Sequence, residues 1–110
     1  MGADETILMQ LYEVIESRKA GDPEQSYTAR LFAKGTHKIA QKLGEEAVET
    51  AIAAVAESQE RLVRESADLI YHLLVLWAHK GVKPSLVWEE IEHRFGATGL
   101  AVKEARKKKD

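Results

Sequence analysis

A ten-residue segment from Leu69 to Ala78 places the strongest constraint on how this chain can fold, because it is apolar on nearly every side. It forms the second half of a helical pattern that runs from Gln59 to about Lys80 and has a charged first half. A helix that is apolar all round must be surrounded by protein. A chain of 110 residues has few other helices with which to surround it. The pattern therefore predicts a helix-packed core and a subunit interface, most simply that of a homodimer.

The same segment does not predict a membrane protein. It contains His72 and is too short to cross a bilayer. The N-terminus begins with acidic rather than basic residues, Asp4 and Glu5, so no signal peptide is expected. With 16 basic and 18 acidic residues the net charge is only −2, which does not favour nucleic acid as a partner. We expect a cytoplasmic protein without membrane or nucleic-acid partners.

Runs of alternating apolar and polar residues, as in strands, do not occur in the sequence, and the pattern predicts an all-α fold. We expect an antiparallel bundle of about five helices that forms one domain over residues 1–110, with a polar, basic tail at 97–110. Expected end signals are Gly21, Thr28, Thr36, Ser58 and Gly81. The expected helices are Glu5 to Lys19, Thr28 to about Phe32, Lys38 to about Glu57, Gln59 to about Lys80, and Pro84 to about Phe95.

Acidic side chains gather on two neighbouring predicted helices. At about 100° per residue, Glu45, Glu46 and Glu49 fall within one narrow stripe of the first helix. On the next helix, Glu65 and Asp68 are three positions apart and share a face. The link between these helices is short, so they are expected to form an antiparallel hairpin. Up to five carboxylates can then face one another.

Such a cluster is unfavourable unless a cation lies within it. The chain has no cysteine, so a metal must be bound by carboxylate or imidazole groups, which favours Mg²⁺ or Mn²⁺. Lys38 and Lys42 lie on the glutamate stripe and are placed to meet phosphate oxygens. Asp68 directly precedes the apolar segment, so we do not expect it to be fully exposed to water, and it needs a partner. That partner is either the metal or Arg64, four positions earlier.

A simpler interpretation stays open from spacing alone. The glutamate stripe can be an ordinary solvated helix face with lysine–glutamate pairs such as Lys42–Glu46. The chain would then be a non-catalytic helical dimerisation module.

Two motifs resemble those of a known family. The first is Gly35-x-x-Lys38-Ile39-x-x-Lys42-x-Gly44-Glu45-Glu46-Ala47-x-Glu49, and the second is Glu65-x-x-Asp68-Leu69-x-Tyr71-His72. Together with Ser26-Tyr27-Thr28 they look like the phosphoribosyl-ATP pyrophosphatases of histidine biosynthesis. That family belongs to the all-α nucleoside triphosphate pyrophosphatases, which include the MazG-like proteins. The resemblance covers the chain from about Leu11 to Arg94.

The resemblance implies a reaction and a set of site residues. Phosphoribosyl-ATP is hydrolysed between its α- and β-phosphates to phosphoribosyl-AMP and pyrophosphate, the second step of histidine biosynthesis. The implied Mg²⁺ ligands are Glu45, Glu46, Glu49, Glu65 and Asp68, and Glu46 or Glu49 is the candidate base. The implied substrate and phosphate contacts are Lys38, Lys42, Arg18, Lys19, Ser26, Tyr27, Thr28 and Arg30.

Several of these residues also have plain structural explanations. Arg18 and Lys19 suit a helix C-terminus, and Thr28 suits a helix N-cap. His72 lies on the acidic face, but a core histidine with satisfied hydrogen bonds explains it better than a metal ligand. A MazG-like enzyme that acts on other nucleoside triphosphates is the nearest alternative function.

Overall fold

The computed structural model of the chain describes residues 3–4 and 6–96, which form helices and connecting loops without a strand among them. The all-α prediction is therefore confirmed. The predicted basic tail at 97–110 lies outside the described residues. The described helices are α1 (Thr6–Ser17), α2 (Tyr27–Lys34), α3 (Thr36–Ala56), α4 (Gln59–Lys80) and α5 (Pro84–Phe95).

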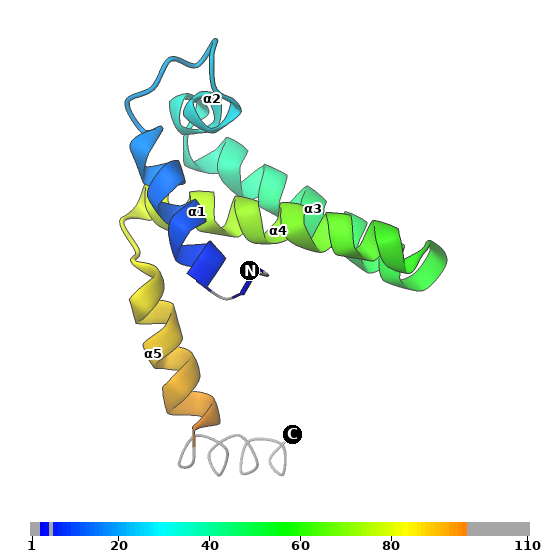
Figure 1. The fold of residues 1–110 in the computed structure, drawn as a ribbon. Helices are drawn as coiled ribbons and strands as arrows, with labels where there is room; N and C mark the ends of the chain where they lie inside the picture. The colour runs from blue at the N-terminus through cyan, green and yellow to red at the C-terminus, as the bar shows by residue number, and fades with distance from the viewer. Residues whose placement is uncertain (1–2, 5, 97–110) are drawn as a thin grey trace.

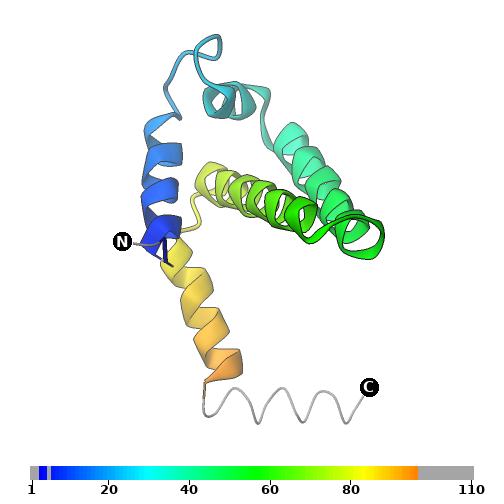
Figure 2. The same cartoon turned by 45° about the vertical axis from the view of Figure 1, so that its right-hand side comes forward.

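The two longest helices, α3 and α4, run side by side as an antiparallel hairpin (Figures 1 and 2). Only residues 57–58 connect them. The hydroxyl of Ser58 accepts a hydrogen bond of 3.1 Å from the backbone N–H of Arg61, which makes Ser58 the N-cap of α4, as predicted. Gly81 ends α4 with a left-handed backbone conformation at φ 71°, also as predicted.

The core lies where α1 and α2 pack against the hairpin. Its buried members are Tyr12, Ile15, Leu31, Ile39, Leu74, Val75 and Ala78. Three of them belong to the apolar second half of α4, so the chain covers much of that segment itself. Ile70 in the same segment remains 41% exposed.

The boundary between α2 and α3 differs from the prediction. The N-cap of α2 is Ser26, whose side chain accepts a hydrogen bond from the backbone N–H of Ala29, so the assignment of Thr28 as the cap was wrong. Helix α3 begins at Thr36, and Gly35 is its flanking residue rather than Thr36. The N–H of Gly35 donates to the Leu31 carbonyl, and the carbonyl of Gly35 accepts from the N–H of Ile39. One glycine, at φ 90°, therefore ends one helix and begins the next.

Helix α5 extends away from the hairpin in both views (Figures 1 and 2). Pro84 at its first position is buried, and the indole ring of Trp88 meets that of Trp77 edge to face at 5.8 Å. Beyond this contact Leu86, Ile91 and Phe95 are exposed apolar side chains. None of the described helices is both long and apolar enough to span a membrane.

Candidate metal centre

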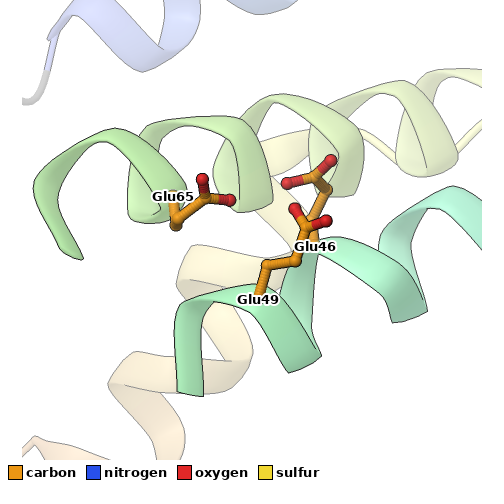
Figure 3. A group of neighbouring side chains, drawn as sticks. All are labelled: Glu46, Glu49 and Glu65. Carbon is orange, nitrogen blue, oxygen red and sulfur yellow. The ribbon is translucent and has the colours of Figure 1, made fainter. Parts of the chain in front are cut away.

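Three carboxylates meet between the arms of the hairpin. Glu46 and Glu49 come from α3 and Glu65 comes from α4, and one oxygen of each lies within 4.8 Å of the others (Figure 3). Glu46 and Glu49 share a face because they are three positions apart on a helix. Glu65 is 6% exposed, which is rare for a charged residue without a strong partner. The predicted encounter of acids from two helices is present in the structure.

The environment of Glu46 opposes its negative charge. Burial is the largest cause that raises the pKa of its carboxyl to about 7, followed by the neighbouring Glu49 and then by Asp68 and Glu65. Around pH 7 the Glu46 carboxyl is therefore only partly ionised when no cation is bound. A divalent cation would take the place of its proton.

Two oxygens in the cluster are buried without a hydrogen-bond donor. They are Oε2 of Glu46 and Oε2 of Glu65. A buried carboxylate oxygen normally has a donor or a cation beside it. These unpaired oxygens and the oxygen-only donor set fit a hard divalent cation such as Mg²⁺ or Mn²⁺.

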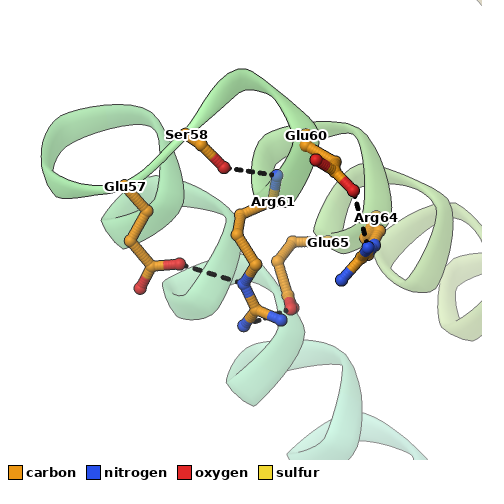
Figure 4. Close-up of polar contacts among 6 residues, drawn as sticks. All are labelled: Glu57, Ser58, Glu60, Arg61, Arg64 and Glu65. Carbon is orange, nitrogen blue, oxygen red and sulfur yellow. Dashed lines mark hydrogen bonds and ion pairs between the residues drawn. The ribbon is translucent and has the colours of Figure 1, made fainter.

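Arg61 holds the other oxygen of Glu65. Its Nη2 lies 3.0 Å from Glu65 Oε1, and its Nε donates to Glu57 Oε1 at 3.0 Å (Figure 4). The pKa of Arg61 is raised, first by the hydrogen bond to Glu57 and then by the charge of Glu65. This pairing was not predicted from the sequence, because four-residue spacing is equally compatible with a pair that lies entirely in solvent. Arg61 thus leaves Glu65 Oε2 free to face the cluster.

Arg64 does not have the predicted partner. Its Nη2 lies 2.7 Å from Glu60 Oε1 on the exposed side of α4, so the alternative in which it neutralises Asp68 was wrong (Figure 4). The two arginines, three positions apart on one helix, therefore offer a matched comparison.

We expect Arg61→Gln to lower the melting temperature of the metal-free protein by several degrees, since it leaves the buried Glu65 carboxylate without a cation. Arg64→Gln breaks only an exposed pair and should change the melting temperature little. Added Mn²⁺ should restore more of the lost stability in Arg61→Gln than in Arg64→Gln. Thermal unfolding of the metal-free and Mn²⁺-loaded proteins measures both effects. Equal losses in the two variants would contradict the role given to Arg61.

Thr50 joins the two helices at the level of the cluster. Its hydroxyl lies 2.7 Å from the carbonyl oxygen of Glu46 on its own helix and 3.1 Å from that of Glu65 on α4. Because the hydroxyl donates toward both backbones, it fixes how far α3 is shifted along α4. A threonine inside a helix gives no such signal in the sequence.

The remaining predicted ligands, Glu45 and Asp68, are not members of the close group of three. Glu45 is exposed, accepts a hydrogen bond of 2.9 Å from Gln41, and lies 3.6 Å from Lys42 Nζ. The hydrogen bond from Gln41 is the largest cause that lowers the pKa of Glu45. Asp68 is also exposed in the single chain, contrary to expectation, although its charge still acts on Glu46. The metal-ligand roles of all five carboxylates stay predictions.

The predicted basic contacts are spread more widely. Lys38 and Lys42 are half-buried along α3, and both charges act on Glu45. Lys19, just after α1, pairs with Glu16 at 3.0 Å, and Arg30 Nε in α2 donates to the carbonyl of Pro23 in the preceding loop at 3.2 Å. Arg18 is exposed.

The Ser26–Thr28 segment contacts the hairpin rather than only solvent. The hydroxyl of Tyr27 lies 3.2 Å from Nε2 of His72, and the hydroxyl of Thr28 bonds to that of Tyr71. His72 is 5% exposed and has both ring nitrogens in hydrogen bonds, as expected of a satisfied core histidine.

The fold and the site define an all-α protein with a cluster of three carboxylates on a helical hairpin. Comparison with known proteins gives the family. Residues 8–95 match the family described as phosphoribosyl-ATP pyrophosphohydrolase, and the chain belongs to this family.

Several similar proteins carry the name phosphoribosyl-ATP pyrophosphatase. The one from Paramagnetospirillum magneticum is 58% identical, with 99% of this chain and all of its own length covered. The one from Azospirillum brasilense is 55% identical over 92% of this chain and 91% of its own length. The one from Trichlorobacter lovleyi is 47% identical over 97% of this chain and 99% of its own length. The family suggested by the two acidic motifs is confirmed.

Proposed function

We propose that this protein hydrolyses phosphoribosyl-ATP between its α- and β-phosphates to phosphoribosyl-AMP and pyrophosphate, as a step of histidine biosynthesis. The observation that carries the proposal is the pair of buried, unpaired carboxylate oxygens of Glu46 and Glu65 in a chain of this family. They support a cation site at which phosphate groups can be bound.

Glu46, Glu49 and Glu65 are the proposed core of a Mg²⁺ site, with Asp68 and Glu45 as further ligands at its edge. A bound Mg²⁺ would neutralise phosphate charge and make a coordinated water more acidic. Arg61 and Thr50 hold Glu65 and the hairpin backbone in place for this site. Mn²⁺ is compatible with the same donor set.

The proposed chemical step is an in-line attack of water on the α-phosphorus. The new bond joins the water oxygen to the α-phosphorus, and the bond from the α-phosphorus to the bridging oxygen breaks. Pyrophosphate leaves with that oxygen, and the proton of the water passes to a carboxylate. Glu46 or Glu49 is the proposed acceptor of the proton, because both lie in the cluster.

Cationic side chains would bind the phosphates that the metal does not contact. Lys38 and Lys42, on α3 ahead of the cluster, are the proposed partners of the departing pyrophosphate. The proposed contacts for the rest of the substrate are Arg18, Lys19, Arg30, Ser26, Tyr27 and Thr28. A cytoplasmic location stays a prediction of the sequence.

A homodimer is part of this proposal. On α3 the exposed apolar side chains Val48, Ile52 and Val55 follow a four- and three-residue spacing and so form one stripe. Val63 and Ile70 add exposed apolar surface on α4, and α5 projects from the hairpin with further apolar side chains. Exposed apolar side chains gathered in a stripe mark a protein interface more often than a free face.

We expect Ile52→Lys to convert a dimer into a monomer, because it places a charge at the centre of the α3 stripe. Ala40→Lys, on the same helix but off the stripe, should leave the dimer intact. Sedimentation velocity at matched concentrations measures the change. A dimer that persists in Ile52→Lys would exclude the α3 stripe as the interface.

The affinity for metal should depend on pH through Glu46. Its pKa of about 7 means that a proton must leave before the cation binds, so the apparent dissociation constant for Mn²⁺ should rise about tenfold per pH unit below pH 7. It should be nearly constant above pH 8. Calorimetric titration with Mn²⁺ measures this dissociation constant between pH 5.5 and 8.5, about the range that brackets the pKa of Glu46. A flat profile would contradict the assignment.

The function is tested by pyrophosphate release from phosphoribosyl-ATP, ATP, dATP, dCTP and dUTP in the presence of Mg²⁺. We expect release from phosphoribosyl-ATP, abolished by EDTA and by Glu49→Gln. Release from the plain nucleotides instead would assign the protein to the MazG-like activity. No release from any substrate would favour the helical dimerisation module.

A further inference from the structure

Two contacts fasten the first turn of α2 to α4, about one helical turn past Asp68. Tyr27 reaches His72, and Thr28 reaches Tyr71. These two α4 residues lie three and four positions after Asp68. Both therefore lie on the same side of the helix as Asp68, one turn further along. One turn is about 5.4 Å along the axis. The first turn of α2 therefore lies just beyond Asp68, next to the proposed phosphate site.

The hydrogen bonds of His72 determine which atoms carry hydrogens. Nδ1 of His72 lies 2.8 Å from the backbone carbonyl of Asp68. A carbonyl only accepts, so the hydrogen is on Nδ1. A neutral imidazole with that hydrogen presents a lone pair at Nε2. With the imidazole neutral, the hydroxyl of Tyr27, 3.2 Å away, donates its hydrogen to His72.

This arrangement leaves the Tyr27 oxygen with lone pairs and no hydrogen to give. Tyr27 as a whole residue is 43% exposed, so a ligand can approach it. Its oxygen can accept a hydrogen bond but cannot donate one, which makes it a poor partner for a phosphate oxygen. It suits a hydroxyl group that donates. Edge-to-face contact between the rings of Tyr27 and His72, with centroids 6.1 Å apart, keeps the phenol in this position.

We propose that the Tyr27 oxygen accepts a hydrogen bond from a ribose hydroxyl of the substrate, and that His72 is the positioning residue that sets its direction. The inference rests on the proposed function. In phosphoribosyl-ATP the ribose of the ATP part is joined directly to the α-phosphate. When the α-phosphate lies at the carboxylate cluster, this ribose is the group that comes next along the molecule. This ribose would therefore lie against the first turn of α2.

The test compares wild-type protein and Tyr27→Phe on phosphoribosyl-ATP and on analogues that lack the 2′- or the 3′-hydroxyl of the ATP ribose. Tyr27→Phe should lower kcat/KM about tenfold on the parent compound, the value of one hydrogen bond. It should have no effect on the analogue that lacks the contacted hydroxyl. Tyr12→Phe removes a phenol hydroxyl that bonds to the Val82 carbonyl away from this site, and should keep the wild-type preference.

The role of His72 has its own readouts. Nitrogen-15 spectra of the imidazole should show hydrogen on Nδ1 and a resonance of Nε2 that moves in Tyr27→Phe. In His72→Asn the amide can still donate to the Asp68 carbonyl but cannot reach Tyr27, so the preference for the ribose hydroxyl should be lost. The double variant should lose no more than either single variant. If His72→Asn does not fold, the Tyr27→Phe series and the spectra still decide the question.

Three results would overturn the inference. Tyr27→Phe could keep the wild-type preference between the substrates, or it could lower kcat/KM equally on all of them, which would show a structural role alone. The spectra could place the hydrogen on Nε2. In each case wild-type turnover of phosphoribosyl-ATP would persist. Its absence in the wild-type protein would instead overturn the proposed function together with this inference.

Discussion

Exchange of Glu46 for glutamine is expected to lower kcat/KM for phosphoribosyl-ATP by about 10²- to 10⁴-fold, the range for loss of a catalytic proton acceptor. Glutamine keeps the size of the side chain but can neither take a proton nor bring a negative charge to the metal. The affinity for Mn²⁺ should fall in the same variant. Steady-state kinetics with saturating Mg²⁺ and calorimetric titration with Mn²⁺ measure the two losses separately.

Activity should fall in Glu46→Gln, but the thermal stability of the metal-free variant should rise at alkaline pH. In the metal-free protein the pKa of Glu46 is raised from its usual 4.5 to about 7, so the folded state holds this proton more tightly than the unfolded chain does. That contribution is present below pH 4.5 and is lost as the pH rises through about 7. At pH 8 the neutral amide avoids the repulsion, and the metal-free variant should melt a few degrees above wild type.

Two other variants are controls that show whether the loss of activity is specific to Glu46. Glu60→Gln removes a charge that only pairs with Arg64 in solvent, and activity should stay at the wild-type level. Glu45→Gln should cost less activity than Glu46→Gln, because Glu45 lies outside the group of three close carboxylates. Equal losses in Glu45→Gln and Glu46→Gln would instead support equal ligand roles for both.

Ile39→Ala is expected to lower the free energy of unfolding by about 2–5 kcal/mol, the usual cost of emptying a buried isoleucine site. Ile39 has no exposed surface and lies in the core cluster with residues of α1, α2 and α4. It is the buried side chain that anchors the first turn of α3, seven residues before Glu46. Urea unfolding of the metal-free protein measures the loss, which is a large fraction of the stability of a domain of this size.

Ile7→Ala provides the matched control, since the same atoms are removed from a side chain that is 48% exposed. Ile7→Ala should lower the free energy of unfolding by less than about 1 kcal/mol. If the two variants lost the same stability, Ile39 would not be the anchor that its burial indicates.

The sequence predicted the helices well because their end signals are local. Ser58, Gly81 and Pro84 act where the pattern placed them. The N-cap of α2 was misassigned because Ser26 and Thr28 are both suitable cap residues. In the structure Ser26 makes the cap bond, and the Thr28 hydroxyl bonds to Tyr71 on α4 instead. That bond joins residues 43 positions apart, which no local pattern reveals.

The site was predictable to the level of a helix face and no further. Helical spacing placed Glu46 and Glu49 opposite Glu65, and the three carboxylates do meet. Spacing alone did not separate Glu45 from them, because consecutive residues differ by only about 100°. The contacts of Arg61 and Thr50 depend on how far one helix is shifted along the other. That shift follows from packing, which a single sequence does not specify.

The single glycine between α2 and α3 also limits how the chain can vary in length. Each residue added at Gly35 would turn α3 by about 100° relative to α2, and would carry Glu46 and Glu49 round the helix axis away from α4. Insertions and deletions should therefore be absent at this junction among functional variants. The loop at residues 18–26 should tolerate insertions and deletions, because no residue in it both ends one helix and begins the next. In this protein the number of residues between α2 and α3 determines the direction in which the acidic side chains of α3 point around the helix axis.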